Sequence, residues 1–172
     1  MKVDKHVELT LRDEEFLIGG ILLRPSAIYE AIEIISSKDF LSDGFAKVFS
    51  AIHVLSSLGV PLVLSNIAQE LNRIDALDAI GGPKRLAELL NQSVPHHVRY
   101  YAEEVARWSR RRKLIEMVES FKRQIDIDPV FDVDAIASEM SSAGLLVSDI
   151  GNSNQKSCEK IVADKLLKLE VS

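Results

Sequence analysis

The sequence predicts an all-α protein: a compact bundle of short helices, then a long αα-hairpin and a tethered amphipathic helix at the C-terminus. Helix-forming residues dominate the 172-residue chain, and only 6% of its residues are aromatic. Apolar residues recur at helical spacing in several segments, and no segment alternates cleanly between apolar and polar residues as a half-buried strand does. The nearest strand candidate, residues 60–64, contains Pro61, which is disfavoured inside a strand.

Composition limits the kind of protein that this chain can be. A hydrophobic fraction of 47% is sufficient for a packed core, and the net charge of -5 means that the chain as a whole repels nucleic-acid phosphates. The first residues lack the apolar core of a signal peptide, and no stretch has the roughly 18 uncharged apolar residues of a membrane span. We therefore expect a soluble, cytoplasmic protein with no membrane partner, in which direct nucleic-acid binding is disfavoured.

Residues 1–95 are predicted to form a globular head of short helices. A first helix over residues 13–23 begins with an acidic run, which the positive end of the helix dipole favours, and Pro25 ends it. Ser26 is expected to cap a second helix that extends to about residue 37.

A third helix is expected after a corner formed by Asp39 and Phe40, with Ser42 or Asp43 as its N-cap. The Gly-Val-Pro sequence at 59–61 ends it, because proline cannot continue the hydrogen-bond ladder. Its buried face is predicted from the helical spacing of Phe45, Val48, Phe49, Ile52 and Leu55.

Two more short helices complete the predicted head. Asn66 and Gln69 have the spacing of a capping box, which places a helix start at Asn66. Gly81 and Gly82 form a turn, after which Pro83 takes the first position of the next helix.

A helical hairpin is predicted over residues 96–150. Residues 97–127 contain no proline or glycine, so one helix of about 45 Å is allowed at 1.5 Å per residue. Residues 128–129, Asp-Pro, end this helix, and a shorter helix returns to about residue 146. Such a hairpin buries its apolar faces most simply against a second copy of the chain. The expected self-association residues are Ile115, Val118, Phe121, Ile125, Val133, Ile136 and Met140.

Residues 151–172 are predicted to be a flexible linker and an amphipathic tail helix. The apolar stripe that would dock onto a partner consists of Ile161, Val162, Leu166 and Leu169. Cys158, the single cysteine, lies on the same stripe and excludes an internal disulfide. It is interpreted as a packed, inert cysteine, with a reactive thiol at the helix start as the alternative.

The sequence contains no recognisable catalytic, cofactor-binding or metal-binding motif. The loop G-x-x-x-x-G-K-[ST] is absent because no glycine precedes a lysine, and the Gly-Gly pairs at 19–20 and 81–82 are interpreted as packing and turn devices. The histidines and the cysteine do not have zinc spacing. The acidic runs 13–15 and 103–104 are interpreted as helix starts and solvated faces. We therefore expect no enzyme activity from these residues and no cofactor.

A basic run at Arg107 and residues 110–113 is open to two interpretations. It could bind nucleic acid or an acidic partner, or it could be a solvated girdle around the long helix. Four consecutive helical residues point to all sides, which disfavours a single basic stripe. Arg112 shares a column with Val105 and Trp108, so it is predicted to point inward and to need an acceptor.

The order and spacing of several short motifs resemble the N-terminal domain of the DnaB-type replicative DNA helicases over roughly residues 15–150. The motifs are Glu15–Gly20, Asp39–Phe40, Val48–Ile52, Gly59–Pro61, Gly81–Gly82, Tyr101–Val105 and Arg112–Ile115. The resemblance implies that Gly19, Asp39, Phe40, Gly81, Gly82 and Arg112 are structural residues. It also implies a helical head and a hairpin that pairs into dimers, three of which form a ring collar that contacts primase and loader proteins. In that family an ATPase motor follows this domain.

Three departures from the family pattern indicate a divergent head surface. Phe45 stands where the family often has a histidine, residues 61–63 are Pro-Leu-Val in place of Pro-Val-Asp, and Arg85 replaces an aromatic residue. Two hypotheses follow. The chain is either a self-associating scaffold (a homodimer or a higher ring) that binds primase or a helicase loader, or a free-standing adaptor of loader or phage type that binds a full-length helicase. An acidic helical DNA-binding accessory is a weaker third hypothesis.

Overall fold

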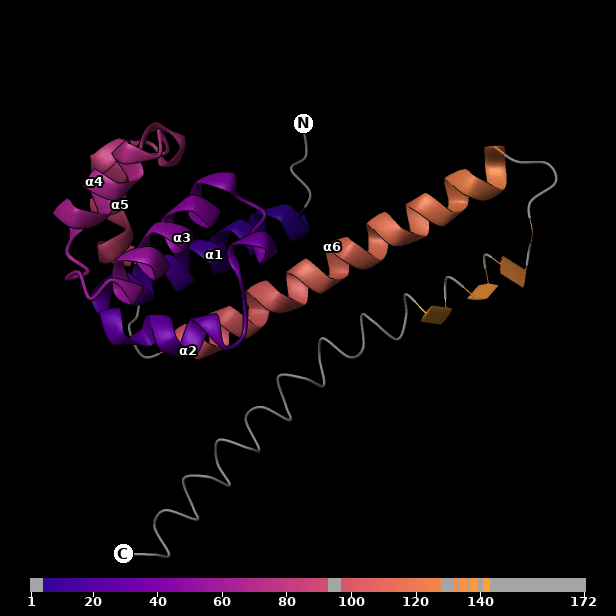
Figure 1. Cartoon of the computed structure of the whole chain (residues 1–172), viewed down its shortest axis with the longest axis horizontal. Coiled ribbons are helices and arrows are strands. Elements are labelled where there is room, and N and C mark those ends of the chain that lie inside the picture. The colour runs from indigo at the N-terminus through magenta and orange to yellow at the C-terminus, as the bar shows by residue number, and fades with distance from the viewer. Residues whose placement is uncertain are drawn as a thin grey trace, which may run out of the picture. The chain divides into compact units, whose positions relative to one another are not determined.

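The computed structural model describes residues 5–92, 97–127, 132, 134–135, 137–138 and 141–142, without the side chains of residues 92 and 127. Every regular element within these residues is helical, which confirms the predicted all-α class (Figure 1). The chain divides between Ser109 and Arg110 into two compact units, and each is described by itself. The α-helices are α1 (Lys5–Leu23), α2 (Ile28–Ile32), α3 (Asp43–Ser57), α4 (Leu64–Arg73), α5 (Gly82–Gln92) and α6 (Val98–Ile127), and the short 3-10 turns are η1 (Pro25–Ala27), η2 (Ser37–Asp39) and η3 (Asp78–Ile80).

Helix α1 begins eight residues before the predicted start at Asp13. The segment from Lys5 contains no proline or glycine, so nothing prevents the helix from extending over it. The hydroxyl of Thr10 also donates a hydrogen bond of 2.8 Å to the carbonyl oxygen of His6 within the same helix. The acidic run therefore lies in the middle of α1, where the helix dipole does not explain its position.

The predicted second helix over residues 26–37 is replaced by two shorter elements. Ser26 lies inside η1 and caps nothing, and α2 ends at Ile32. The amides of Ile34 and Ile35 both donate to the carbonyl oxygen of Ala31, which closes the helix in a tight turn. Ile28 and Ile35 are nevertheless buried in the core, and Ile32 is half-buried against it.

Helix α3 agrees with its prediction at both ends. The hydroxyl of Ser42 accepts a hydrogen bond of 3.3 Å from the amide of Phe45, which makes Ser42 the N-cap. The helix ends before Gly59, whose positive φ of 68° is tolerated by glycine. Of the predicted face, Phe45 is half-buried and the other four residues, Val48, Phe49, Ile52 and Leu55, are buried.

Helix α4 begins at Leu64, two residues before the start predicted from a capping box at Asn66. The side-chain amide of Asn66 donates to the carbonyl oxygen of Pro61 at 2.9 Å, so this residue closes the preceding loop instead of capping the helix. After α4 the chain turns through Asp75, a non-glycine residue with φ of 51°. The amide of Ala76 then donates to the carbonyl oxygen of Leu71 at 2.8 Å, which satisfies the end of the helix.

The turn before α5 uses both predicted glycines. Gly81 and Gly82 have φ values of 89° and 78°, a conformation that L side chains rarely adopt. Helix α5 then begins at Gly82, with Pro83 in its first turn as expected.

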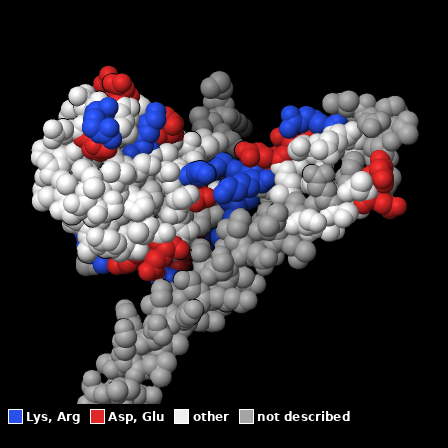
Figure 2. Space-filling view, in the orientation of Figure 1, with Lys and Arg blue, Asp and Glu red and all other residues white. Residues whose placement is uncertain are grey.

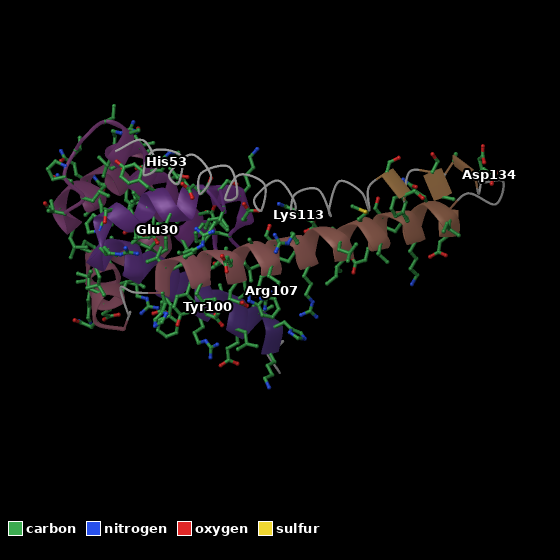
Figure 3. The ribbon with its side chains drawn as sticks, turned by 90° about the horizontal axis from the view of Figure 1, so that it is seen from below. Glu30, His53, Tyr100, Arg107, Lys113 and Asp134 are labelled. Carbon is green, nitrogen blue, oxygen red and sulfur yellow. The ribbon has the colours of Figure 1, made fainter. Side chains whose placement is uncertain are left out.

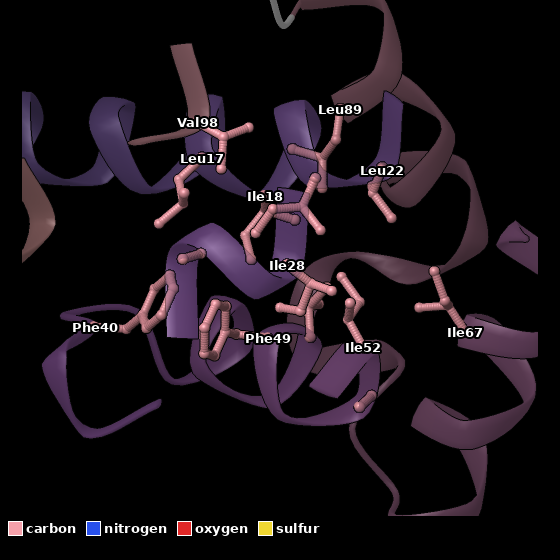
Figure 4. Close-up of a cluster of buried hydrophobic side chains, with 14 of the residues drawn as sticks. Leu17, Ile18, Leu22, Ile28, Phe40, Phe49, Ile52, Ile67, Leu89 and Val98 are labelled. Atoms are coloured by element: carbon pink, nitrogen blue, oxygen red, sulfur yellow. The ribbon is translucent and has the colours of Figure 1, made fainter. Parts of the chain in front are cut away.

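One hydrophobic core joins these helices (Figure 4). It contains residues of α1 to α5 and also the first three turns of α6, where Val98, Ala102 and Val105 are fully buried. The predicted boundary between head and hairpin falls before α6, whereas the two compact units divide inside that helix. The first part of the long helix is thus a component of the head.

Candidate protein-interaction site

Helix α6 is one continuous helix of 30 residues, as the absence of proline and glycine predicted. Its first part is held to the head by aromatic contacts as well as by aliphatic packing. The rings of Phe16 and Tyr101 stack at a centroid distance of 5.2 Å. Burial, and secondarily the charge of Asp13, raises the pKa of Tyr101 above its ordinary value. On the outer side of this part of the helix, Tyr100 and Arg107 project away from the head (Figure 3).

Two hydrogen bonds tie the last head-bound turn of α6 to buried or half-buried carboxylates. The indole nitrogen Nε1 of Trp108 donates to Oδ2 of Asp13 at 3.0 Å, and the hydroxyl of Ser109 donates to Oδ1 of Asp39 at 2.7 Å. The other oxygen of Asp39 accepts from the amide of Ser36 at 2.9 Å, in a capping box that starts η2. Asp39 therefore connects the corner before α3 with α6.

Phe40, the other residue of the corner motif, is buried and its ring lies 5.2 Å from that of Phe49 in α3. Gly19 is buried within α1. Together with Asp39 and the positive-φ glycines of the α5 turn, these residues contribute to the packing of the head.

The acidic run in α1 is a correction to the sequence interpretation, which placed it at a solvated helix start. Glu14 has an exposed fraction of 0%, and its carboxylate accepts hydrogen bonds from the backbone amides of Leu41 and Ser42. A carboxylate from α1 thus satisfies amides at the beginning of α3. A signal was present in the sequence, because Glu14, Leu17 and Ile21 share one helical face, which makes Glu14 a polar residue on an apolar stripe.

The second half of α6, from Arg110 to Ile127, has exposed apolar side chains. Val118 has an exposed fraction of 54%, and Leu114, Ile115 and Ile125 are also exposed, whereas Phe121 is buried with a fraction of 6%. Ile115, Val118, Phe121 and Ile125 belong to the predicted self-association set. The remaining predicted residues Val133, Ile136, Met140, Ile161, Val162, Leu166 and Leu169, and also Cys158, lie outside the described residues.

Basic residues gather around the middle of α6. Arg107 forms an ion pair of 2.9 Å with Glu104, one turn before it, and Arg112 is half-buried. Figure 2 shows a group of lysine and arginine side chains over the middle of α6. Because the run covers all sides of the helix, it does not define one basic stripe.

The part of the chain that the structure describes holds no group of three or more histidine, cysteine, aspartate or glutamate side chains that could bind a metal ion. Within the same residues, no helix combines the length and the apolar composition needed to cross a membrane.

These features define a class: an all-α domain in which a helical head is closed by the first half of a long helix. Comparison with known proteins then identifies the family. The chain belongs to the DnaB-like helicase N-terminal domain family, whose model matches residues 8–107. The resemblance stated from the motif series is thereby confirmed.

Curated relatives and solved structures agree with this assignment. The chain is 28% identical over 156 residues to the replicative DNA helicase DnaC of Bacillus subtilis, covering 90% of this chain and 33% of that protein. It is 32% identical over 130 residues to DnaB of Geobacillus stearothermophilus, covering 72% and 28%. The chain thus spans about a third of the length of these relatives.

Two solved structures share the fold. The N-terminal domain of the DnaB helicase from Mycobacterium tuberculosis matches with a TM-score of 0.70 and 27% identity, covering 77% of this chain and 94% of that one. The corresponding domain from Helicobacter pylori, described together with its interactions with primase, matches with a TM-score of 0.62 and 22% identity, covering 72% and 98%. The second likeness is one of fold alone.

Proposed function

We propose that this chain acts as the non-catalytic N-terminal collar-type domain of a replicative DNA helicase, which associates with itself and binds primase or a helicase loader. The observation that carries the proposal is the row of exposed apolar residues on the second half of α6. Leu114, Val118 and Ile125, together with the buried Phe121, follow one another at intervals of four, three and four residues. This is the spacing at which one helix packs along another in a coiled coil.

Membership of the family supports the choice of partners. The Helicobacter pylori domain is described with its interactions with primase, and the present chain shares its fold. The first part of α6 is buried in the head as far as Ala106. An exposed apolar row on a helix is suited to protein contacts, since contiguous exposed apolar surface in soluble proteins commonly marks an interaction site.

Sedimentation equilibrium of the whole chain tests self-association. The wild-type chain is expected to form a dimer or a larger species at micromolar concentration, and Val118→Asp is expected to weaken that association because a carboxylate would enter an apolar contact. Arg123→Gln is the matched control, because it also lowers the net charge by one and lies on the opposite side of the helix. A strictly monomeric wild-type chain at high micromolar concentration would contradict the proposal.

Partner binding needs a separate measurement. Titration calorimetry with the primase and with the helicase loader of the same genome is expected to give binding to one of them. Native mass spectrometry of the chain mixed with the full-length helicase of that genome examines the adaptor alternative. Mixed rings without binding to primase or loader would favour a free-standing adaptor over a collar domain.

A further inference from the structure

The charged residues on the second half of α6 are distributed unevenly around the helix. Because a helix turns by about 100° per residue, Arg110, Arg111 and Lys122 lie within about 70° of the middle of the exposed apolar row. Arg110 precedes Leu114 by four residues, which makes the two neighbours on one face. Lys122 follows Val118 by the same interval. Arg111 and Lys122 are exposed, and Arg110 is half-buried. The row is therefore bordered by basic side chains near its beginning and near its end.

The acidic residues of the same half lie away from the row. Glu116, Glu119 and Asp126 are all the acidic residues between positions 110 and 127, and each of them is exposed. The same helical geometry places them at least about 110° from the middle of the row. Within residues 110–127, the face that carries the apolar row is therefore basic.

The outer side of the first half of α6 differs, because its arginines have acidic neighbours. Arg107 pairs with Glu104 at 2.9 Å, and Arg99 pairs with Glu103 at 3.3 Å. Each pair joins residues about one turn apart on the helix surface, so each neutralises its own charge. The positive charge beside the apolar row is thus a property of the second half and not of the helix as a whole.

We infer that the apolar row of α6 binds an acidic amphipathic helix of another protein, whose apolar side chains pack along the row and whose carboxylates pair with the basic residues that border it. The inference rests on the proposed function, in which the row is a site of protein contact, and it names the chemistry of the partner. Opposite charges at the edges of an apolar contact speed association and exclude partners whose own edges are basic. Long basic side chains suit this arrangement, because their aliphatic stems cover apolar surface while their charged ends reach outward.

The spacing of the row favours a helix over a membrane or a nucleic acid as the partner. Intervals of four, three and four residues form a narrow seam that one partner helix can fill. A helix that lies in a membrane surface buries its large apolar side chains in the lipid, whereas Phe121, the aromatic residue of the row, is already buried within the chain. Nucleic-acid phosphates would pair with the basic residues but would leave the aliphatic side chains of the row uncovered.

Fluorescence anisotropy with synthetic peptides tests the inference on the whole chain. The probe is a labelled peptide of about 20 residues that forms an amphipathic helix, with leucine on its apolar face and glutamate along both borders. The comparison peptide has lysine in place of every glutamate. The glutamate peptide is expected to bind at least about tenfold more tightly at low salt. The difference is expected to shrink as salt is added, because salt screens exposed charges.

Charge reversal at two adjacent residues separates local charge from overall charge. Lys122→Glu is expected to weaken binding of the glutamate peptide by about fivefold and to strengthen binding of the lysine peptide. Arg123→Glu is the matched control, because it makes the same change of charge on the side of α6 opposite the row, and it is expected to change either affinity by less than about twofold. Circular dichroism checks that both variants fold, which is expected because both residues are exposed.

The outcomes separate the inference from the proposed function. Val118→Asp is expected to abolish binding of the glutamate peptide, and retained binding would place the peptide outside the row and overturn the inference. Equal affinity for the two peptides, or equal weakening by Lys122→Glu and Arg123→Glu, would also overturn it, while self-association of the wild-type chain would leave the proposed function standing. A monomeric chain that binds neither peptide would contradict both.

Two further probes examine the other possible partners at the same salt concentration. They are vesicles of phosphatidylglycerol and a labelled thymidine oligonucleotide. Binding of either probe without binding of the glutamate peptide would assign the basic border to a lipid surface or to nucleic acid, and it would overturn the inference.

Discussion

The two halves of α6 have comparable apolar spacing but opposite surroundings. In the first half, Val98, Ala102, Val105 and Ala106 are buried in the core of the head. Beyond Ser109, Leu114, Ile115, Val118 and Ile125 are exposed. The difference shows that periodicity identifies the apolar side of a helix without identifying what covers it. In the first half the cover is the chain's own head, and in the second half we propose that it is another protein.

The transition between the halves coincides with a change in polar contacts. Trp108 and Ser109 are the last residues of the first unit, and both donate to carboxylates of the head. Residues 110–113, which form the basic run, come directly after Ser109 in the sequence.

The largest effect on stability is expected from an aspartate in the first half of α6, and a much smaller one from an aspartate in the second half. Val105→Asp would bury a carboxylate at a position with an exposed fraction of 0%, and it should destabilise the head by about 4 kcal/mol or more. Val118→Asp should change the stability of the monomer by less than about 0.5 kcal/mol, because this side chain is half in water. Urea unfolding followed by circular dichroism measures the free energy of unfolding of both variants. Equal losses of stability in the two variants would contradict the difference in burial between the two halves of α6.

A smaller but substantial effect is expected from Glu14→Gln. The glutamine side chain keeps one acceptor oxygen and presents an NH2 group to the other backbone amide, so one buried donor loses its partner. The expected loss is about 2–3 kcal/mol, because hydrogen bonds to a charged acceptor are among the stronger ones. Glu103→Gln makes the same chemical change at an exposed ion pair, and thermal unfolding should detect little difference from the wild type.

Ser109→Ala removes the hydrogen bond from Ser109 to Asp39 at the boundary between the two units. Oδ1 of Asp39 would lose the hydrogen bond from Ser109, and the expected loss of stability is about 1 kcal/mol. Hydrogen exchange is expected to increase most in the turn of α6 around Ser109. The control is Ser57→Ala, whose hydroxyl is exposed and bonds only to Val54 within its own helix. No change in exchange near Ser109 would mean that this bond does not secure the helix.

The smallest expected effect is a stabilisation. Asp75 adopts a φ of 51°, so Asp75→Gly should relieve strain and raise the free energy of unfolding by about 0.5 kcal/mol. Because Asp75 lies in the head, the change should leave the association of the second half of α6 untouched. A variant that is more stable but associates differently would show that the two regions are coupled.

The sequence correctly predicted the elements whose ends are determined by residues within or next to the element itself. The lack of proline and glycine over residues 97–127 predicted α6 to within one residue, and Ser42 and the Gly-Val-Pro sequence marked both ends of α3. The turn at Gly81 and Gly82 was also predicted, because a positive φ favours glycine.

The errors arose where a side chain bonds to a distant segment. The acidic run of α1 resembled a helix start, whereas Asp13 and Glu14 bond to residues 95 and 27 or more positions away. Asn66 had capping-box spacing but bonds to the loop before it. The cavity of about 430 Å³ that Leu55, Val60, Asn66 and Gln69 help to line has no sequence motif, because it depends on how α4 packs against the end of α3. The self-association and tail residues stay predictions.

The bond between Glu14 and the start of α3 has a consequence for how the chain reaches its fold. Helix α3 takes part of its capping from α1 and is therefore not self-sufficient. During synthesis α1 leaves the ribosome first, so its carboxylate is already available when the amides of Leu41 and Ser42 emerge. A chain made without its first fourteen residues would have to form α3 with those amides unsatisfied. We expect such a chain to depend on chaperones and to be degraded more rapidly than the full-length protein.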